Sequence, residues 1–258
     1  SVPLPLLEET EFNFSLEALE KLITPKTKMI IVNSPQNPTG GVLTKETLEG
    51  VAKLAVQHDL WVLSDEIYDQ IIYEGEHISI TSFPGMPERT VILNGCSKTY
   101  AMTGWRLGWA VTKSREMAQY LEQLIINDTS CTAAMIQYAG MEALTGPQEA
   151  VGVMREEYKK RRDLLVSLVN DIPGMSCHSP KGAFCLFVNV KPILAKLGIN
   201  SSELADKVLR EGHVVILPGT AFGAHGEGYI RFSYVSSEAD IKEGLTRMKN
   251  YLATIYQP

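Results

Sequence analysis

The sequence has 258 residues and a net charge of −6, and 45% of its residues are hydrophobic. This composition is typical of a globular protein with a large core, and the length allows one large domain or two modest ones. The acidic balance argues against nucleic acid as the main partner, because phosphate binding needs clustered lysine and arginine. No apolar run approaches the roughly 20 residues that a membrane-spanning helix needs, so we expect no membrane partner.

The N-terminal residues, SVPLPLLEETEF, lack the basic and apolar regions of a signal peptide. The cysteines form no CxxC pair and no histidine cluster joins them, so we expect reduced thiols in a cytoplasmic protein and no zinc site. The cysteines are Cys96, Cys131, Cys177 and Cys185, and the scattered histidines are His58, His77, His178, His213 and His225. Because the chain starts at Ser1 rather than at a methionine, we also expect that an N-terminal part is absent.

Helix and strand patterns alternate through the first 150 residues. Ser15 and Thr44 each precede an amphipathic run, so each can accept a hydrogen bond from the first turn of a helix. The second of these helices is expected to bury Leu48, Val51, Ala52, Ala55 and Val56. Continuous apolar runs predict strands covered on both faces, and they lie at 29–33, 61–65, 91–95 and 108–112. Strands separated by helices of this length predict βαβ units and a mostly parallel sheet.

The pattern changes after about residue 150. Residues 146–171 predict one long charged helix, which leads into a second unit. This unit has strands expected at 183–190, 214–219 and 229–235, and helices that begin near Ser202 and Ser237. The last helix is expected to bury Ile241, Leu245, Met248 and Leu252. We therefore predict two domains, residues 1–150 and a smaller α+β domain over residues 151–258.

Polar residues follow the predicted strands where each strand ends. The strand at 29–33 runs into SPQNPTGG, the next strand ends on Asp65 before EIYDQ, and the strand at 91–95 runs into CSKTY. In open α/β sheets, ligands bind outside the carboxyl ends of the strands. We therefore expect five side chains to converge on one edge of the sheet: Asn37, Asp65, Tyr68, Ser97 and Lys98.

These residues also have a purely structural interpretation. Asn37 lies in NPTG, which is a good turn sequence. Asp65 would cap a helix that follows its strand, and Tyr68 would be a core aromatic residue whose hydroxyl has a partner. Lys98 and Arg106 would be surface charges, as most such residues are. Their joint occurrence at strand ends favours the functional interpretation.

Six segments carry a resemblance that runs, in order, through almost the whole chain. They are NSPQNPTGG, SDEIYDQIIY, SKTYAMTGWRLGW, PKGAFCLFVNV, VILPGTAFG and YIRFSY. They resemble the fold-type I, class I/II pyridoxal-phosphate-dependent aminotransferases, the aspartate aminotransferase superfamily. The resemblance implies the α/β fold of these transferases, with a mostly parallel sheet and flanking helices, present in part, and a smaller α+β C-terminal domain. It also implies pyridoxal 5′-phosphate as cofactor and the transfer of an amino group from an L-amino acid to a 2-oxo acid.

The resemblance assigns roles to the residues at the strand ends. Lys98 resembles the lysine that forms a Schiff base with pyridoxal phosphate and moves the substrate proton, and a desolvated lysine amine suits both tasks. Asp65 resembles the carboxylate that faces the pyridine nitrogen and keeps it protonated. Tyr68 and Asn37 resemble the pair that forms hydrogen bonds to the phenolic oxygen of the ring.

The remaining implied roles concern the phosphate and the substrate. Ser97 and Arg106 resemble phosphate ligands, because a guanidinium fork with an added hydroxyl suits a dianion. Arg231, within YIRFSY, resembles the residue that binds the substrate α-carboxylate, with Asn37 as a second substrate contact. Alternatively, Arg231 would be an edge-strand arginine with its head in water. Phe222 either lines the same cleft or packs in the core.

Three functions remain open on the sequence alone. The first is a cytoplasmic, homodimeric aminotransferase. The second is a C–S lyase or ring-forming synthase of the same superfamily, which would use the same residues. The third is an aminotransferase-like ligand sensor in a transcription regulator. The substrate is also open, because an acidic side chain would call for a second arginine, and Arg89, Arg115 and Arg155 lie in segments typical of surface turns or helices.

Compared with this family, an N-terminal part is expected to be missing. That part supplies a phosphate-binding turn, an aromatic residue that stacks on the pyridine ring, and strands of the large-domain sheet. We therefore expect an exposed sheet edge, which is a liability unless it is covered or paired. We also expect weak cofactor binding by the 258-residue chain alone.

Overall fold

The structure is a computed structural model that describes residues 1–256, and the chain divides into two compact units. The first unit contains residues 1–36 and 41–155, and the second contains residues 37–40 and the chain from Glu156 onward. The strands are β1 (Met29–Asn33), β2 (Trp61–Asp65), β3 (Thr90–Gly95), β4 (Gly108–Val111), β5 (Cys185–Asn189), β6 (Leu217–Pro218) and β7 (Tyr229–Ser233). The α-helices are α1 (Leu16–Leu22), α2 (Lys45–Gln57), α3 (Cys96–Thr99), α4 (Arg115–Asp128), α5 (Ala134–Thr145), α6 (Glu149–Asn170), α7 (Lys191–Leu197), α8 (Ser201–Arg210) and α9 (Glu238–Ile255).

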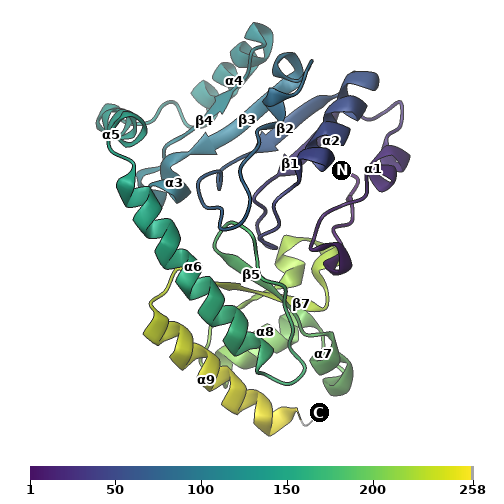
Figure 1. The fold of residues 1–258 in the computed structure, drawn as a ribbon, viewed down its shortest axis with the longest axis vertical. Coiled ribbons are helices and arrows are strands. Elements are labelled where there is room, and N and C mark those ends of the chain that lie inside the picture. Colours follow the sequence, from purple (N-terminus) through teal and green to yellow (C-terminus); the bar gives the residue numbers. More distant parts are fainter. Residues whose placement is uncertain (257–258) are drawn as a thin grey trace. The chain divides into compact units, whose positions relative to one another are not determined.

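The first unit is built around a four-stranded sheet with the order β1-β2-β3-β4 (Figure 1). The β1–β2 and β2–β3 pairs are parallel and the β3–β4 pair is antiparallel, so the prediction of a mostly parallel sheet is confirmed. The strands at 29–33 and 61–65 have the predicted bounds. Asn33 lies beside Asp65, and Asp65 lies beside Leu93. The carboxyl ends of three strands therefore meet at one edge.

Helix α2 packs on β1 and β2, and Figure 1 shows it across these strands. The Ser15 and Thr44 side chains accept hydrogen bonds from the first turns of α1 and α2, as predicted. The buried residues of α2 are Leu48, Val51, Ala52, Leu54 and Ala55. The prediction for Val56 is wrong, because this residue lies in the last turn, at the border of the buried face, and is 44% exposed.

One face of this sheet is open in the described part of the chain, so the prediction of strands covered on both faces is wrong there. Ile30 and Val32 are buried, whereas Met29 and Ile31, on the opposite face of β1, are 40% and 68% exposed. Within residues 1–256, α4 buries none of its residues and α5 buries only Gly140. Neither helix therefore provides a packed second layer for that face.

The second unit contains an antiparallel sheet with the order β5-β7-β6 (Figure 1). The long predicted helix is α6, and the predicted core face of α9 is confirmed, since Ile241, Leu245, Met248 and Leu252 are buried. Helix α8 begins at Ser201, next to the predicted position, with Asn200 as its N-cap. The strand expected at 214–219 is reduced to β6, where Pro218 has no amide hydrogen with which to extend the pairing.

Of the helices within residues 1–256, none has both the length and the apolar character that a membrane crossing would require.

Candidate active site

The candidate site of the first unit lies at the carboxyl ends of β2 and β3. Asp65 is the last residue of β2, and Lys98 lies in α3, directly after β3. The Lys98 Nζ atom lies 5.8 Å from the centre of the Tyr68 ring, and the Lys98 charge acts on the Asp65 carboxyl. The structure therefore brings together three of the five side chains that the sequence predicted to converge.

Asp65 does not cap a helix, because the residues that follow it form a turn. The Asp65 Oδ1 atom accepts a hydrogen bond from the Ile67 amide at 3.2 Å, and Asn33 Nδ2 donates to the Asp65 carbonyl at 3.2 Å. Burial raises the pKa of the Asp65 carboxyl, while the Ile67 amide and the Lys98 charge lower it. Within residues 1–256, the second carboxylate oxygen of Asp65 has no donor, so it is available to a cationic N–H group.

Helix α3 positions Ser97 and Lys98. It has four residues and is preceded by Gly95. A Cβ atom on Gly95 would lie 2.8 Å from the Leu107 carbonyl oxygen and 2.9 Å from the Gly108 Cα atom. Only glycine allows this close backbone approach, which places the helix against the start of β4. Both Ser97 and Lys98 remain partly exposed and can reach a ligand.

Arg106 lies in the loop before β4, with an exposed side chain and a left-handed backbone (φ 58°). Its NH1 group donates to the Thr103 carbonyl at 2.9 Å. In the described part of the chain, it makes no hydrogen bond or ion pair with Ser97 or Lys98. Its predicted role as a phosphate ligand therefore remains a prediction.

Asn37 and Arg231 belong to the second unit, where Arg231 NH1 donates to Asn37 Oδ1 at 3.0 Å. Arg231 pairs with Phe187 on one side and with Leu217 on the other. The edge-strand interpretation of Arg231 is therefore wrong, because β7 is the central strand of its sheet.

The Arg231 guanidinium has an unused donor. Its carbon lies 4.9 Å from the centre of the Phe222 ring, which covers one side of the group. Its Nε atom is buried and has no hydrogen-bond partner within residues 1–256. A buried, unpaired donor on a cation is costly, and a carboxylate ligand would satisfy it.

A buried polar network lies behind the site, and the sequence analysis did not identify it. Glu66 is 5% exposed and accepts hydrogen bonds from Ser64 Oγ at 2.9 Å and from Ser79 Oγ at 2.8 Å. His77 Nε2 lies 2.8 Å from its other oxygen. Asp69 Oδ2 accepts from Asn94 Nδ2 at 3.1 Å. The signal in the sequence that could have indicated it is the occurrence of three carboxylates within five residues in DEIYD.

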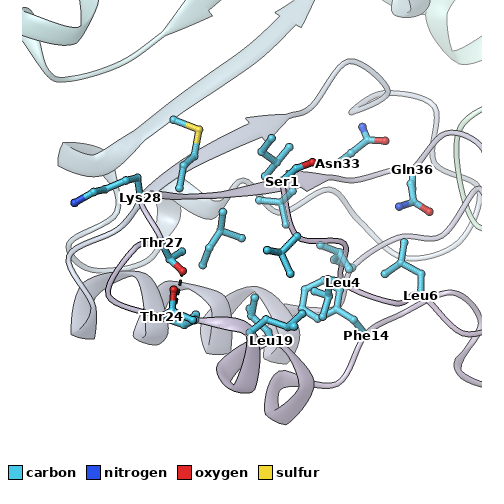
Figure 2. A pocket seen from close by; sticks show the side chains of 18 of the residues that line it. Ser1, Leu4, Leu6, Phe14, Leu19, Thr24, Thr27, Lys28, Asn33 and Gln36 are labelled. Atoms are coloured by element: carbon cyan, nitrogen blue, oxygen red, sulfur yellow. Dashed lines mark hydrogen bonds between the residues drawn. The ribbon is translucent and has the colours of Figure 1, made fainter. Parts of the chain in front are cut away.

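An apolar cavity of the first unit lies away from this site (Figure 2). Its volume is about 540 Å³, and it is lined by the N-terminal residues up to Phe14, by α1 and by β1. Neither Asp65 nor Lys98 lines it. Figure 2 shows Leu4, Phe14 and Leu19 around this space. The cavity therefore belongs to the open edge beside β1 rather than to the candidate site. Among residues 1–256, no group of three or more histidine, cysteine or acidic side chains could hold a metal ion.

Known proteins resemble this chain along nearly its whole length. Residues 1–248 match the family model of class I and II aminotransferases. The chain belongs to this family. An aromatic-amino-acid aminotransferase of Thermococcus litoralis and an aspartate aminotransferase of Pyrococcus abyssi are both 43% identical to it, each over 97% of this chain and 64% of the relative. The crystal structure of an aromatic aminotransferase from Pyrococcus horikoshii superimposes with a TM-score of 0.91 at 41% identity, over 98% of this chain and 67% of that one.

The aminotransferase family fixes the fold and the relevant cofactor. The fold is that of the fold-type I pyridoxal phosphate enzymes, and pyridoxal phosphate is the cofactor of the family. The chain spans 64% of the length of these two relatives. The residues present fit this cofactor, because the free oxygen of Asp65 suits a protonated ring nitrogen and Lys98 supplies an amine for an aldehyde.

Proposed function

We propose that the protein transfers an amino group from an L-amino acid to a 2-oxo acid, with pyridoxal phosphate held at Lys98. The observation that carries the proposal is the placement of Lys98 beside Tyr68 and Asp65, at the ends of parallel strands in a member of the aminotransferase family. In this proposal residues 1–150 are the C-terminal portion of the cofactor-binding domain, and residues 151–258 are the small domain.

Each predicted site residue of the first unit has a role in the proposed reaction. When bound, pyridoxal phosphate supplies an electron sink for the charge that develops at the substrate α-carbon. Asp65 holds a proton on the ring nitrogen through its free oxygen. Lys98 would hold the cofactor through its aldehyde group, and its amine, once displaced by the amino group of the substrate, would move the proton of the α-carbon as base and acid. Tyr68 would donate to the phenolic oxygen of the ring, and Ser97 and Arg106 would bind the phosphate.

The second unit supplies the substrate contacts in this proposal. Arg231 binds the α-carboxylate, which would satisfy its buried Nε atom. Asn37, which already accepts from Arg231 NH1, orients the guanidinium and also contacts the cofactor and the substrate. Stacking on Phe222 restricts the guanidinium further.

The proposal includes aromatic and acidic amino acids as amino donors. The two relatives at 43% identity have names that refer to different amino acids, one aromatic and one acidic. A panel of amino donors with 2-oxoglutarate or pyruvate as acceptor would determine the preference. Release of pyruvate and ammonia without an acceptor would instead indicate a lyase, and ligand binding without turnover would indicate a sensor.

Covalent mapping tests the site. The full-length protein is loaded with pyridoxal phosphate, reduced with borohydride and digested, and the modified peptide is identified by mass spectrometry. We expect the label on Lys98, no label in Lys98→Ala, and normal labelling in Lys113→Ala, which removes an exposed lysine paired with Glu88. A label on any other lysine would contradict the proposal.

We also propose a homodimer in the cytoplasm. All four cysteines are free, which suits a reducing compartment. Helices α4 and α5 expose large apolar side chains, among them Leu124, Met135 and Tyr138, and exposed patches of this kind often mark an interface. Light scattering of the full-length protein would give its mass, and a monomer at micromolar concentration would contradict the homodimer.

A further inference from the structure

Asp69 lies in the turn after β2, and its carboxylate contacts residues at both ends of the helix that carries Lys98. The Asp69 Oδ2 atom accepts a hydrogen bond from Asn94 Nδ2 at 3.1 Å, and Oδ1 accepts from Thr99 Oγ1 at 3.3 Å. Asn94 lies two residues before α3, and Thr99 is its last residue. A longer contact of 3.5 Å joins Gln70 Nε2 to Oδ2. One side chain therefore holds the segment before and after Lys98.

Helix α3 needs support from outside, because a helix of four residues is not stable by itself. Part of that support is the hydrogen bond from the Cys96 amide to the Leu107 carbonyl, at 3.1 Å. Part is burial, since Cys96 is fully buried and Thr99 is 3% exposed. Asn94 adds to it, because its Oδ1 atom accepts from the Gly95 amide at 2.7 Å while its Nδ2 atom donates to Asp69.

The turn that carries Asp69 is itself fixed on the sheet. The Asp69 amide donates to the Glu66 carbonyl at 3.0 Å, and the Glu66 amide donates to the Leu93 carbonyl at 2.9 Å. The Glu66 side chain is anchored by the buried network described above. Tyr68, directly before Asp69, turns its ring toward Lys98. The same short turn therefore presents one residue to Lys98 and another to the backbone around it.

We propose that Asp69 is a positioning residue for Lys98. Its carboxylate fixes the orientation of α3 and thereby the place of the Lys98 amine relative to Tyr68 and Asp65. The inference rests on the proposed function, because it assigns Asp69 a part in the chemistry of Lys98. The Asn94 amide and the Thr99 hydroxyl donate to different oxygens of the carboxylate, and its negative charge strengthens both hydrogen bonds. An asparagine would lose this charge, and it would keep both contacts only if the Thr99 hydroxyl turned to accept from the new N–H group instead of donating.

Three variants of the full-length protein test the proposal. Asp69→Asn keeps the shape and removes one acceptor, and Thr99→Val keeps the volume and removes one donor. Glu76→Gln is the matched control, because it changes an exposed acidic residue in the same connection between β2 and β3. Thr99→Val leaves Asp69 and Asn94 paired, so it tests the proposal even where Asp69→Asn folds poorly.

The first measurement is amide hydrogen exchange on the protein without cofactor. We expect exchange of the amides in residues 95–101 to become about tenfold faster in Asp69→Asn, since a lost hydrogen bond to a charged group has an effect of this order. The increase in Thr99→Val should be smaller, and Glu76→Gln should match the wild type. Amides of α2 should be unchanged in all three variants.

The second measurement is made on the loaded protein. We expect Asp69→Asn to lower kcat by about tenfold to a hundredfold and to change KM by no more than about twofold, because a misplaced reacting group affects the chemical step. The pH midpoint of the visible absorption of the bound cofactor should shift in Asp69→Asn and stay in place in Glu76→Gln.

Unchanged exchange in residues 95–101, or an unchanged absorption midpoint, would overturn the proposal. Equal acceleration in α2 would also overturn it, because it would show a general loss of structure. A wild-type protein that takes up pyridoxal phosphate on Lys98 but transfers no amino group would instead contradict the proposed function. The expected shifts in exchange and absorption would then still support Asp69 as the residue that positions Lys98.

Discussion

Asp65, at the end of β2, carries a charge that its partly buried environment disfavours. Burial is the largest influence on its pKa and raises it above the ordinary value of 3.8, the Ile67 amide opposes this effect, and neighbouring Glu66 adds to it. The folded protein therefore keeps a proton on Asp65 up to a higher pH than the unfolded chain does. Stability falls as the pH rises through the interval between the two pKa values, and it stays lower above that interval.

Replacing Asp65 by asparagine should stabilise the cofactor-free protein and impair its function. The oxygen of the new side-chain amide can still accept from the Ile67 amide, but the side chain has no charge to desolvate. We expect Asp65→Asn to raise Tm by about 1–2 °C at neutral pH, and the gain should disappear as the pH falls below the ordinary pKa of 3.8. Transaminase activity should fall by about a hundredfold or more, because in the proposed site the ring nitrogen would lose its anionic partner. A lower Tm at neutral pH, measured by scanning calorimetry, would contradict this account.

Amino acid turnover should depend on the planar guanidinium group of Arg231. Arg231→Lys keeps the charge but removes the stacking on Phe222 and the two-point grip on a carboxylate. We expect kcat/KM for amino acid substrates to fall by about a hundredfold. The control is Arg247→Lys, because Arg247 is 51% exposed and pairs with Glu243 on α9. Equal kinetic effects of the two variants would exclude a substrate contact at Arg231.

The sequence predicted that side chains would meet at the ends of the parallel strands, but not the contacts that support them. Asp65, Tyr68 and Lys98 could be placed because they follow apolar strands, and parallel strands end at one edge of a sheet. The contacts of Asp69 with Asn94 and Thr99 depend on the path of a turn, which has no periodic signal. The convergence of Asn37 on the same edge stays a prediction; its described contacts are with Cys185 and with Arg231, a residue 194 positions away.

At the scale of elements, the sequence predicted those whose signals are local. The caps of α1, α2 and α9 are serine or threonine side chains directly before an apolar period, and all three are present. The strands β1 and β2 are short β-branched runs with the predicted bounds. Helices α4 and α5 were not predicted, and in the described part of the chain they bury almost none of their side chains.

The N-cap of α8 permits a stability test. The Asn200 side chain accepts from the Glu203 amide at 3.0 Å, and Glu203 accepts from the Asn200 amide at 2.9 Å, which forms a capping box. We expect Asn200→Ala to lower the free energy of unfolding by about 1 kcal/mol, as measured by urea denaturation with circular dichroism. Asn250→Ala, the same substitution at an exposed position within α9, should be neutral or slightly stabilising. A neutral Asn200→Ala would mean that α8 does not depend on its cap.

At the scale of the whole chain, the unpaired edge of the first sheet is the dominant feature. Within residues 1–256, β1 pairs only with β2, and a cavity of about 540 Å³ adjoins its other side (Figure 2). The relatives are longer than this chain, which spans 64% of their length. An apolar edge strand that lacks a partner favours pairing with another chain. The 258-residue chain by itself should therefore associate through β1.

A charge at Ile31 should have different effects in the 258-residue chain and in the full-length protein. It lies in the middle of β1 and is 68% exposed, so in the 258-residue chain a charge there meets water and hinders association at the edge. We expect Ile31→Lys to reduce light scattering and the fluorescence of a hydrophobic dye by about half or more, with little effect on unfolding. Val215→Lys, at a side chain that is 78% exposed and outside any strand, should leave both signals near the wild-type level.

In the full-length protein we expect the same Ile31→Lys to lower the free energy of unfolding by about 2 kcal/mol or more, because any segment that covers β1 there would bury the added charge. Destabilisation of the 258-residue chain by Ile31→Lys would show that this face of β1 is already covered there. A neutral effect in the full-length protein would show that the face stays exposed to water. Either result would contradict the expected difference.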